Sequence, residues 1–266
     1  GFTHRAFDLD RAFFRYQPTG AGWKTVLQGG KFKPPFMASE IIWDNDVTVE
    51  GIGQQFSRKI GDTTLDANFG QFIYDEFDPG EDIIILGYQG IITQKTGLGK
   101  FKVALAYYDV QNTEDISTTF SGSSTLLSNT SEVKILDLMV EWSEKIAGQK
   151  LKLFGEYSQN TGDLASGNPD LDTAWQLGAK YGSSGKKFGD YDMKIIYRVV
   201  QTEAVFDVIS DSDFHDGRSN ARGFKAEGSF GLAKGVKLRF AYFDTQEERG
   251  TQRDHEKFQA DLKFKF

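Results

Sequence analysis

The last nine residues of the chain, 258–266, constrain its fold more than any other stretch. Apolar and polar side chains alternate there without a break, with Phe258 and Leu262 in one set and Lys263 and Lys265 in the other. Side chains alternate across a β-strand, so this strand has one apolar and one charged face. A final strand of this kind, ending on Phe266, is typical of a transmembrane β-barrel, where one face meets lipid and the other meets water.

Composition is compatible with a barrel and excludes several other classes of protein. The 266 residues include 29 Gly and only 5 Pro, which suits many strands joined by tight turns. Mean hydropathy is −0.44, and no run approaches the roughly 20 apolar residues of a membrane-spanning helix. The absence of Cys excludes disulfides and cysteine metal sites, and the net charge of −7 argues against a nucleic-acid partner.

The alternation predicts about thirteen strands, and their connections sort into short turns, among them 183–185, and long loops. This sorting favours an outer-membrane barrel over a soluble β-sandwich or β-solenoid, in which alternation is also expected. We therefore predict an all-β, transmembrane, antiparallel up-and-down β-barrel that forms a single domain over residues 1–266. The predicted strands are 7–16, 23–32, 47–59, 65–72, 83–95, 101–110, 133–142, 150–159, 173–181, 191–200, 223–230, 236–242 and 258–266.

The odd strand count predicts that the domain is incomplete at its N-terminus. Single-chain bacterial barrels have an even number of strands, with both termini on the short-turn side. Counting back from Phe266, the first visible strand would run from the long-loop side. We therefore expect at least one strand before Gly1 and a total of about 14–18 strands.

Parity along the strands predicts which side chains face the barrel interior. If the aliphatic residues face lipid, their neighbours face the lumen, where a large barrel solvates charged groups and encloses a channel. Pairing of these charges across neighbouring strands is an equally open interpretation. The predicted pore-lining residues are Arg11, Arg15, Lys102, Glu141, Lys150, Lys152, Glu156, Lys180, Asp192, Lys194, Arg198, Lys225, Glu227, Lys237, Arg239, Asp261 and Lys263.

The charges also predict an axial asymmetry. The inner wall is mostly basic, and rings of charge bias the permeation of small ions. The long loops are acidic, so we expect an acidic mouth above a basic wall. The acidic residues of the loops include those of segment 75–82 and Asp207, Asp211, Asp213, Asp216, Glu247 and Glu248.

Segment 34–46 is the predicted constriction. It is too apolar for a freely solvated loop, so we expect it to fold inward, although packing on a neighbouring subunit would also cover it. The spacing of oxygen-bearing residues from Asp44 to Glu50 loosely resembles a calcium loop, but the glycine and the final glutamate are misplaced, so no metal site is predicted. The constriction candidates are Glu40, Trp43, Asp44 and Asp46.

The sequence offers little support for catalysis. His4, His215 and His255 lie in predicted loops or at strand ends, and none has the spacing of a catalytic triad or a metal site. We expect these histidines at a solvated rim, and neither an enzyme nor a cofactor.

Three stretches resemble a known family: 9–15 (LDRAFFR), 29–36 (GGKFKPPF) and 41–51 (IIWDNDVTVEG). They resemble the bacterial putative porins, and the GKFKPPF element also resembles the phosphate- and polyphosphate-selective porins. The resemblance implies an outer-membrane β-barrel of a Gram-negative bacterium, often a homotrimer, that conducts small hydrophilic solutes by diffusion. Arg11, Arg15, Lys31 and Lys33 occupy the matching motif positions.

These observations together predict a water-filled outer-membrane channel for small hydrophilic solutes and ions, with a lean towards anions. Its expected partners are outer-membrane lipids, its solutes and two further copies of the chain. The main alternative is a non-channel outer-membrane barrel that acts as a surface-binding or scaffold protein. A barrel enzyme such as a lipase or protease would need a catalytic cluster at the rim.

Overall fold

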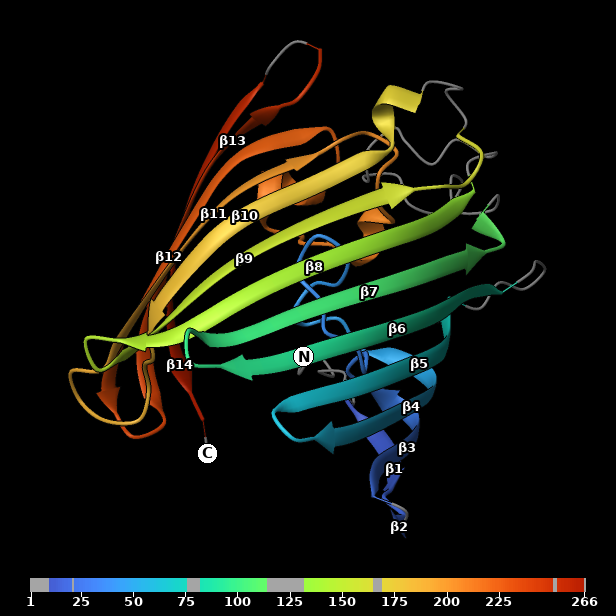
Figure 1. Cartoon of the computed structure of the whole chain (residues 1–266). Helices are drawn as coiled ribbons and strands as arrows, with labels where there is room; N and C mark the ends of the chain where they lie inside the picture. The colour runs from blue at the N-terminus through green and yellow to red at the C-terminus, as the bar shows by residue number, and fades with distance from the viewer. Residues whose placement is uncertain are drawn as a thin grey trace, which may run out of the picture.

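The computed structural model describes residues 10–20, 22–75, 82–113, 132–164, 169–250 and 253–265. In these ranges a single curved antiparallel sheet makes up most of the fold (Figure 1). Three 3-10 helices accompany it: η2 (Pro169–Leu171), η3 (Asp207–Ile209) and η4 (Phe214–Gly217). The strands are β1 (Ala12–Tyr16), β2 (Thr19–Gly20), β3 (Trp23–Phe32), β4 (Val49–Ile60), β5 (Thr63–Asp75), β6 (Ile83–Thr96), β7 (Gly99–Gln111), β8 (Val133–Ile146), β9 (Gln149–Asn160), β10 (Thr173–Gly182), β11 (Tyr191–Val200), β12 (Ala221–Ala233), β13 (Val236–Glu247) and β14 (Asp254–Phe264).

The strand order confirms the predicted up-and-down fold. Each strand pairs with the next along the chain, except that β3 pairs with β1 and also with the two-residue β2. Within the described ranges no ladder joins β14 to β1, so the sheet is open there. From β3 onward the strands have 10 to 14 residues, which is enough for a tilted strand to cross a bilayer. None of the helices in the described part of the chain is long and apolar enough to span a membrane.

The connections differ in length between the two edges of the sheet. Two-residue turns at 61–62, 97–98, 147–148 and 234–235 lie at one edge, called the short-turn edge below. Ala147 and Gly148 have φ values of 49° and 81°, the left-handed pair that a two-residue hairpin turn favours. Between β10 and β11 the connection covers eight residues, 183–190, so the short turn predicted at 183–185 is part of a longer connection.

The two faces of the sheet have opposite character. On β8, Leu136, Leu138 and Val140 are 42%, 42% and 46% exposed, whereas Asp137 between them is 1% exposed. The alternating pattern places the large apolar side chains on the outer, convex face. The concave face is covered near the long-connection edge by segments 33–48 and 201–220, the blue and orange stretches inside the curve of Figure 1.

An apolar cluster joins these two segments to the concave face. Its strand residues come from β3 to β11, and its segment residues come from the two connections. The concave face is therefore apolar near the long-connection edge and charged towards the short-turn edge. The buried cluster includes Phe32, Phe72, Ile85, Tyr108, Val133 and Val200 from the strands and Ile41, Ile42, Trp43, Val205, Phe206 and Ile209 from the segments.

Candidate functional site

Segment 33–48 is held on the concave face by a seat for Phe36. Gly70 of β5 and Gly87 of β6 are directly opposite each other, and a Cβ atom at Gly87 would lie 2.3 Å from Cζ of Phe36. The missing side chains thus leave room for the Phe36 ring. Tyr108 and Trp43 pack against that ring with centroid distances of 5.3 and 6.2 Å. The glycines and the aromatic side chains together select this docked position.

The backbone of the same segment is held by side chains of the sheet. Gln89 accepts a hydrogen bond from the Met37 N–H at 2.8 Å and donates one to the Met37 carbonyl at 2.6 Å. Gln55 donates to the Pro35 carbonyl at 3.1 Å. Gln89 is 4% exposed, so these bonds satisfy polar groups that have left water.

Segment 201–220 meets segment 33–48 directly. The Asp44 N–H donates to the Ile209 carbonyl at 2.7 Å, and the Asp211 N–H donates to the Glu40 carbonyl at 2.9 Å. The Ser212 hydroxyl and N–H both donate to the Asp44 carboxylate, at 3.0 and 3.1 Å. Two connections that lie far apart in the sequence therefore form one layer over the sheet.

A cluster of buried charges joins that layer to β11 and β12. Lys225 Nζ lies 2.7 Å from the Glu40 carboxylate and 2.9 Å from the Asp211 carboxylate. Arg198 lies 2.9 Å from Asp211 and 3.6 Å from Glu40, and Lys194 lies 3.8 Å from Glu40. The side chains of Arg198 and Lys225 are each only 2% exposed. Buried charges require such partners, because desolvation of an isolated ion costs several kcal/mol.

The cations of the cluster keep Glu40 ionised. Burial favours the neutral form, but the ammonium groups of Lys194 and Lys225 outweigh it and hold the pKa of Glu40 below its usual value of 4.5. Asn45 also donates a hydrogen bond to this carboxylate. Glu40 is therefore a carboxylate at neutral pH that faces three cations of the sheet.

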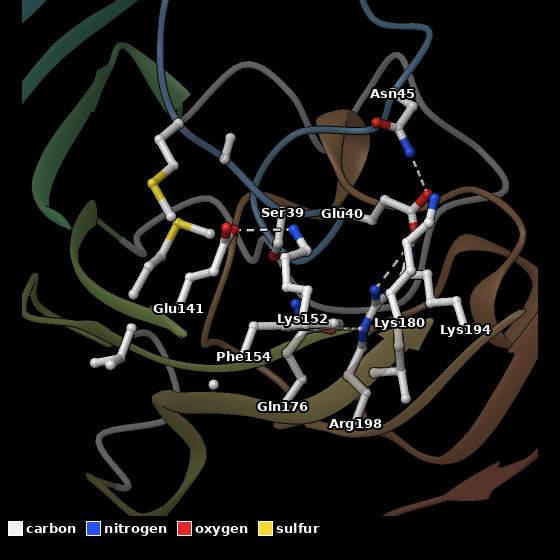
Figure 2. Close-up of a pocket in the computed structure, with 16 residues that line it drawn as sticks. Ser39, Glu40, Asn45, Glu141, Lys152, Phe154, Gln176, Lys180, Lys194 and Arg198 are labelled. Carbon is white, nitrogen blue, oxygen red and sulfur yellow. Dashed lines mark hydrogen bonds and ion pairs between the residues drawn. The ribbon is translucent and has the colours of Figure 1, made fainter. Parts of the chain in front are cut away.

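A charged cavity of about 240 Å³ lies beside Glu40, between segment 33–48 and strands β8 to β11. Figure 2 shows the pair Glu141 and Lys152 on one side of it and Glu40 with Lys194 and Arg198 on the other. The cavity places both signs of charge around a small volume. Such a site favours water and hydrophilic solutes over apolar ones.

Around the cavity and towards the short-turn edge, the charges of the concave face form ion pairs between strands. Lys194 lies 3.0 Å from Glu227, and Arg239 contacts the same carboxylate. This finding favours the interpretation in which charges pair across strands over a wall of free charge. The other pairs are Glu141–Lys152 at 2.9 Å, Lys180–Asp192 at 3.4 Å and Arg239–Asp261 at 3.7 Å.

A comparison with protein families gives a match over both halves of the chain. The family described as putative porin matches residues 1–135 and 124–266. The chain belongs to the putative porin family. A comparison with curated proteins gave no significant match.

Four predicted lumen lysines of this porin-family chain stand apart from the ion pairs. No carboxylate oxygen of the described residues lies within 4.0 Å of their ammonium groups. Lys102 is opposite Glu141 in the ladder, but that carboxylate contacts Lys152 instead. These lysines lie towards the short-turn edge, where they leave a surplus of positive charge. They are Lys102, Lys150, Lys237 and Lys263.

The remaining predicted site residues have varied positions. Arg15 donates to Gln28 at 3.1 Å, and Arg11 lies before β1 and pairs with Asp10 at 3.1 Å. Glu156 is 5% exposed and accepts a hydrogen bond from Gln176 at 2.7 Å.

The constriction candidates separate into two groups. Glu40 contacts both the second segment and the sheet, whereas Asp44 contacts the second segment. Trp43 is 4% exposed and lies in the apolar cluster, away from the charged cavity, and Asp46 is exposed at the surface of the segment.

Part of the expected acidic mouth is buried instead. Asp207 and Asp211 are 7% and 5% exposed, because segment 201–220 folds onto the sheet with its apolar side chains. His215, expected at a solvated rim, is 6% exposed and its Nδ1 lies 3.0 Å from the Thr245 hydroxyl. Burial and then the neighbouring His255 lower the pKa of His215, which favours the neutral imidazole. Residues 76–81, His4 and Phe266 lie outside the described ranges.

The sequence-based reasoning missed segment 201–220 as part of the site. Its signal was present, since Val205, Phe206, Ile209 and Phe214 make it as apolar as segment 34–46. The acidic residues between them led to the solvated assignment. In the described part of the chain, no group of three or more His, Cys, Asp or Glu side chains is arranged to hold a metal ion.

Proposed function

We propose that this protein is an outer-membrane channel for the passive diffusion of small hydrophilic solutes and ions. The observation that carries the proposal is the inward layer of segments 33–48 and 201–220. It contacts the concave face through Glu40 and Asp211 and borders a charged cavity. Inward-folded loops above a charged wall would narrow a channel without filling it with side chains of the strands.

The convex face supports a membrane location. Leu177, Met193 and Ile195 on adjacent strands are 61%, 62% and 52% exposed. Aliphatic side chains in a continuous outer band stabilise a barrel in lipid and would promote aggregation of a soluble protein. The family match supports the same location. The short-turn edge would then face the periplasm.

The charge balance of the concave face supports weak anion preference. Most cations of the concave face are compensated by carboxylates, whereas Lys102, Lys150, Lys237 and Lys263 are not. A modest excess of positive charge near one mouth raises the local concentration of anions. The channel would need neither cofactor nor catalytic step.

Planar-bilayer recordings test the channel function directly. We expect the detergent-purified protein to give stepwise increases in conductance from stable open channels. In a KCl gradient, the reversal potential should have the sign expected for chloride preference. Heat-modifiable mobility in SDS gels shows that a preparation is folded. The absence of conductance in such a folded preparation would refute the proposal. A clear preference for potassium would refute the anion assignment alone.

A non-channel barrel is the second candidate, because one observation favours it. The apolar cluster around Phe72, Tyr108 and Phe206 fills the concave face near the long-connection edge, as in a barrel that serves as a rigid scaffold. The same recordings distinguish the two candidates, since a scaffold would show no open steps. The family resemblance supports a homotrimer, and crosslinking in native outer membranes would detect three copies or refute that assembly.

A further inference from the structure

Five lysines gather at the short-turn edge of the sheet, away from the inward layer. Lys95 is directly opposite Lys100 in the β6–β7 ladder, and Lys145 is directly opposite Lys150 in the β8–β9 ladder. Lys186 belongs to the neighbouring connection between β10 and β11. Together with these four it lines a cavity of about 620 Å³.

The side chains of the four strand lysines are on the concave face. Thr93 and Ser143 are 8% and 5% exposed on that face, and Lys95 and Lys145 follow them by two residues. Because strand side chains alternate, each lysine shares the face of the buried residue before it. Directly opposite residues also share a face, so Lys100 and Lys150 are there as well.

The positive charge of this lysine cluster is not compensated locally. In the described ranges, no carboxylate oxygen lies within 4.0 Å of any of the five ammonium groups. Glu144 also borders the cavity, but it is one residue from Lys145 and so belongs to the opposite face. Its carboxylate accepts a hydrogen bond from the Lys145 backbone N–H at 2.8 Å.

Two directly opposed pairs of like charge destabilise a ladder. Elsewhere on the concave face, lysines such as Lys152 and Lys194 have carboxylate partners at 2.9 and 3.0 Å. The cluster thus differs from the ion-paired part of the same face. A bound anion would remove the repulsion that the protein itself leaves uncompensated, and several mobile ammonium groups suit an anion with more than one charge.

We propose that the lysine cluster is a binding site for small anions that carry two or more negative charges, such as sulfate or a tricarboxylate. This inference rests on the proposed channel function, because only in a channel does the lysine cluster form part of a mouth at the short-turn edge. Entry of such anions from that side would be favoured, and monovalent anions would bind too weakly to be retained.

Calorimetric titration of the detergent-folded protein with citrate tests the site without using conductance. We expect saturable binding at low ionic strength, weakened at least tenfold in the variant K100Q/K145Q/K150Q and weakened by added salt. The control K31Q/K134Q/R253Q removes an equal number of positive charges at the opposite edge and should bind citrate like the wild type. Both variants are first shown to be folded by heat-modifiable mobility in SDS gels.

Equal citrate affinity in the cluster variant and the wild type would overturn the proposal, as would acetate binding as tightly as citrate. If citrate binds in the predicted manner but no conductance is seen, the site stands and the channel function fails. If the protein conducts and citrate does not bind, the channel stands and the site fails. Where both hold, citrate added at the short-turn side should reduce the current more than citrate added at the other side.

Discussion

The substitution E40Q isolates the contact between the inward layer and the sheet. Gln preserves the shape of Glu40 but removes the charge that faces Lys225 at 2.7 Å, Arg198 at 3.6 Å and Lys194 at 3.8 Å. Asp211 remains as a partner for Lys225, at 2.9 Å. The loss is therefore smaller than the roughly 3–5 kcal/mol for a buried pair that is fully broken.

A hydrogen bond to a charged group contributes about 1.5–3 kcal/mol, so we expect E40Q to weaken docking of segment 33–48 by about 2–3 kcal/mol. At about 1.4 kcal/mol per factor of ten, the undocked population rises roughly 30- to 150-fold. Hydrogen–deuterium exchange of the amides at 37–45 measures that change directly. In bilayers, the same variant should show more frequent transitions between conductance levels.

The matched control for E40Q is D46N. Asp46 is in the same segment and carries the same charge, but it is exposed and has no cation within 4.0 Å among the described residues. We expect D46N to exchange and conduct like the wild type. Unchanged exchange at 37–45 in E40Q, or equal acceleration in both variants, would refute the role assigned to the ion cluster.

Three further predictions concern the seat, the pH response and the lipid face. G87V places side-chain atoms where the Phe36 ring now lies, so exchange at 37–45 should accelerate at least as much as in E40Q. The pKa of Glu40 is lowered on docking, so its stabilisation is complete above pH 4.5 and is lost as pH falls through the lower, docked value. Relative to the intrinsic exchange rate, which itself slows as pH falls, exchange at 37–45 in the wild type, but not in E40Q, should accelerate over that range. L138R adds a charge to the convex face and should destabilise the folded barrel by about 2–4 kcal/mol in urea titrations in lipid.

Matched variants control for general effects of the substitutions G87V and L138R. No atom lies within 4 Å of a Cβ at Gly90 on the same strand as Gly87, so G90V should leave exchange at 37–45 unchanged. Leu98 is in a two-residue turn and is 78% exposed, so L98R should leave the urea midpoint unchanged. Equal effects of L138R and L98R would contradict the assignment of the convex face to lipid.

The faces of the strands could be predicted from the sequence, because alternation is a local property. Each strand from β3 onward contains its own pattern of apolar and polar residues, as Leu136, Asp137 and Leu138 illustrate. The side of the sheet follows from the period of two alone. The same pattern, together with the lengths of the connections, was sufficient to predict an antiparallel up-and-down sheet.

Only the tertiary structure shows which charges of the inner face are compensated and which connections cover it. Glu40 and Lys225 are 185 residues apart, and Asp44 and Ser212 are 168 residues apart. No local pattern encodes such pairs. Asp211 was assigned to solvent because it lies in an acidic stretch, yet burial of the neighbouring Phe206 and Ile209 brings it to Arg198 and Lys225. The sequence thus determined which side chains face inward, since parity is a property of single strands. The position of the inward layer depended on the packing of distant segments.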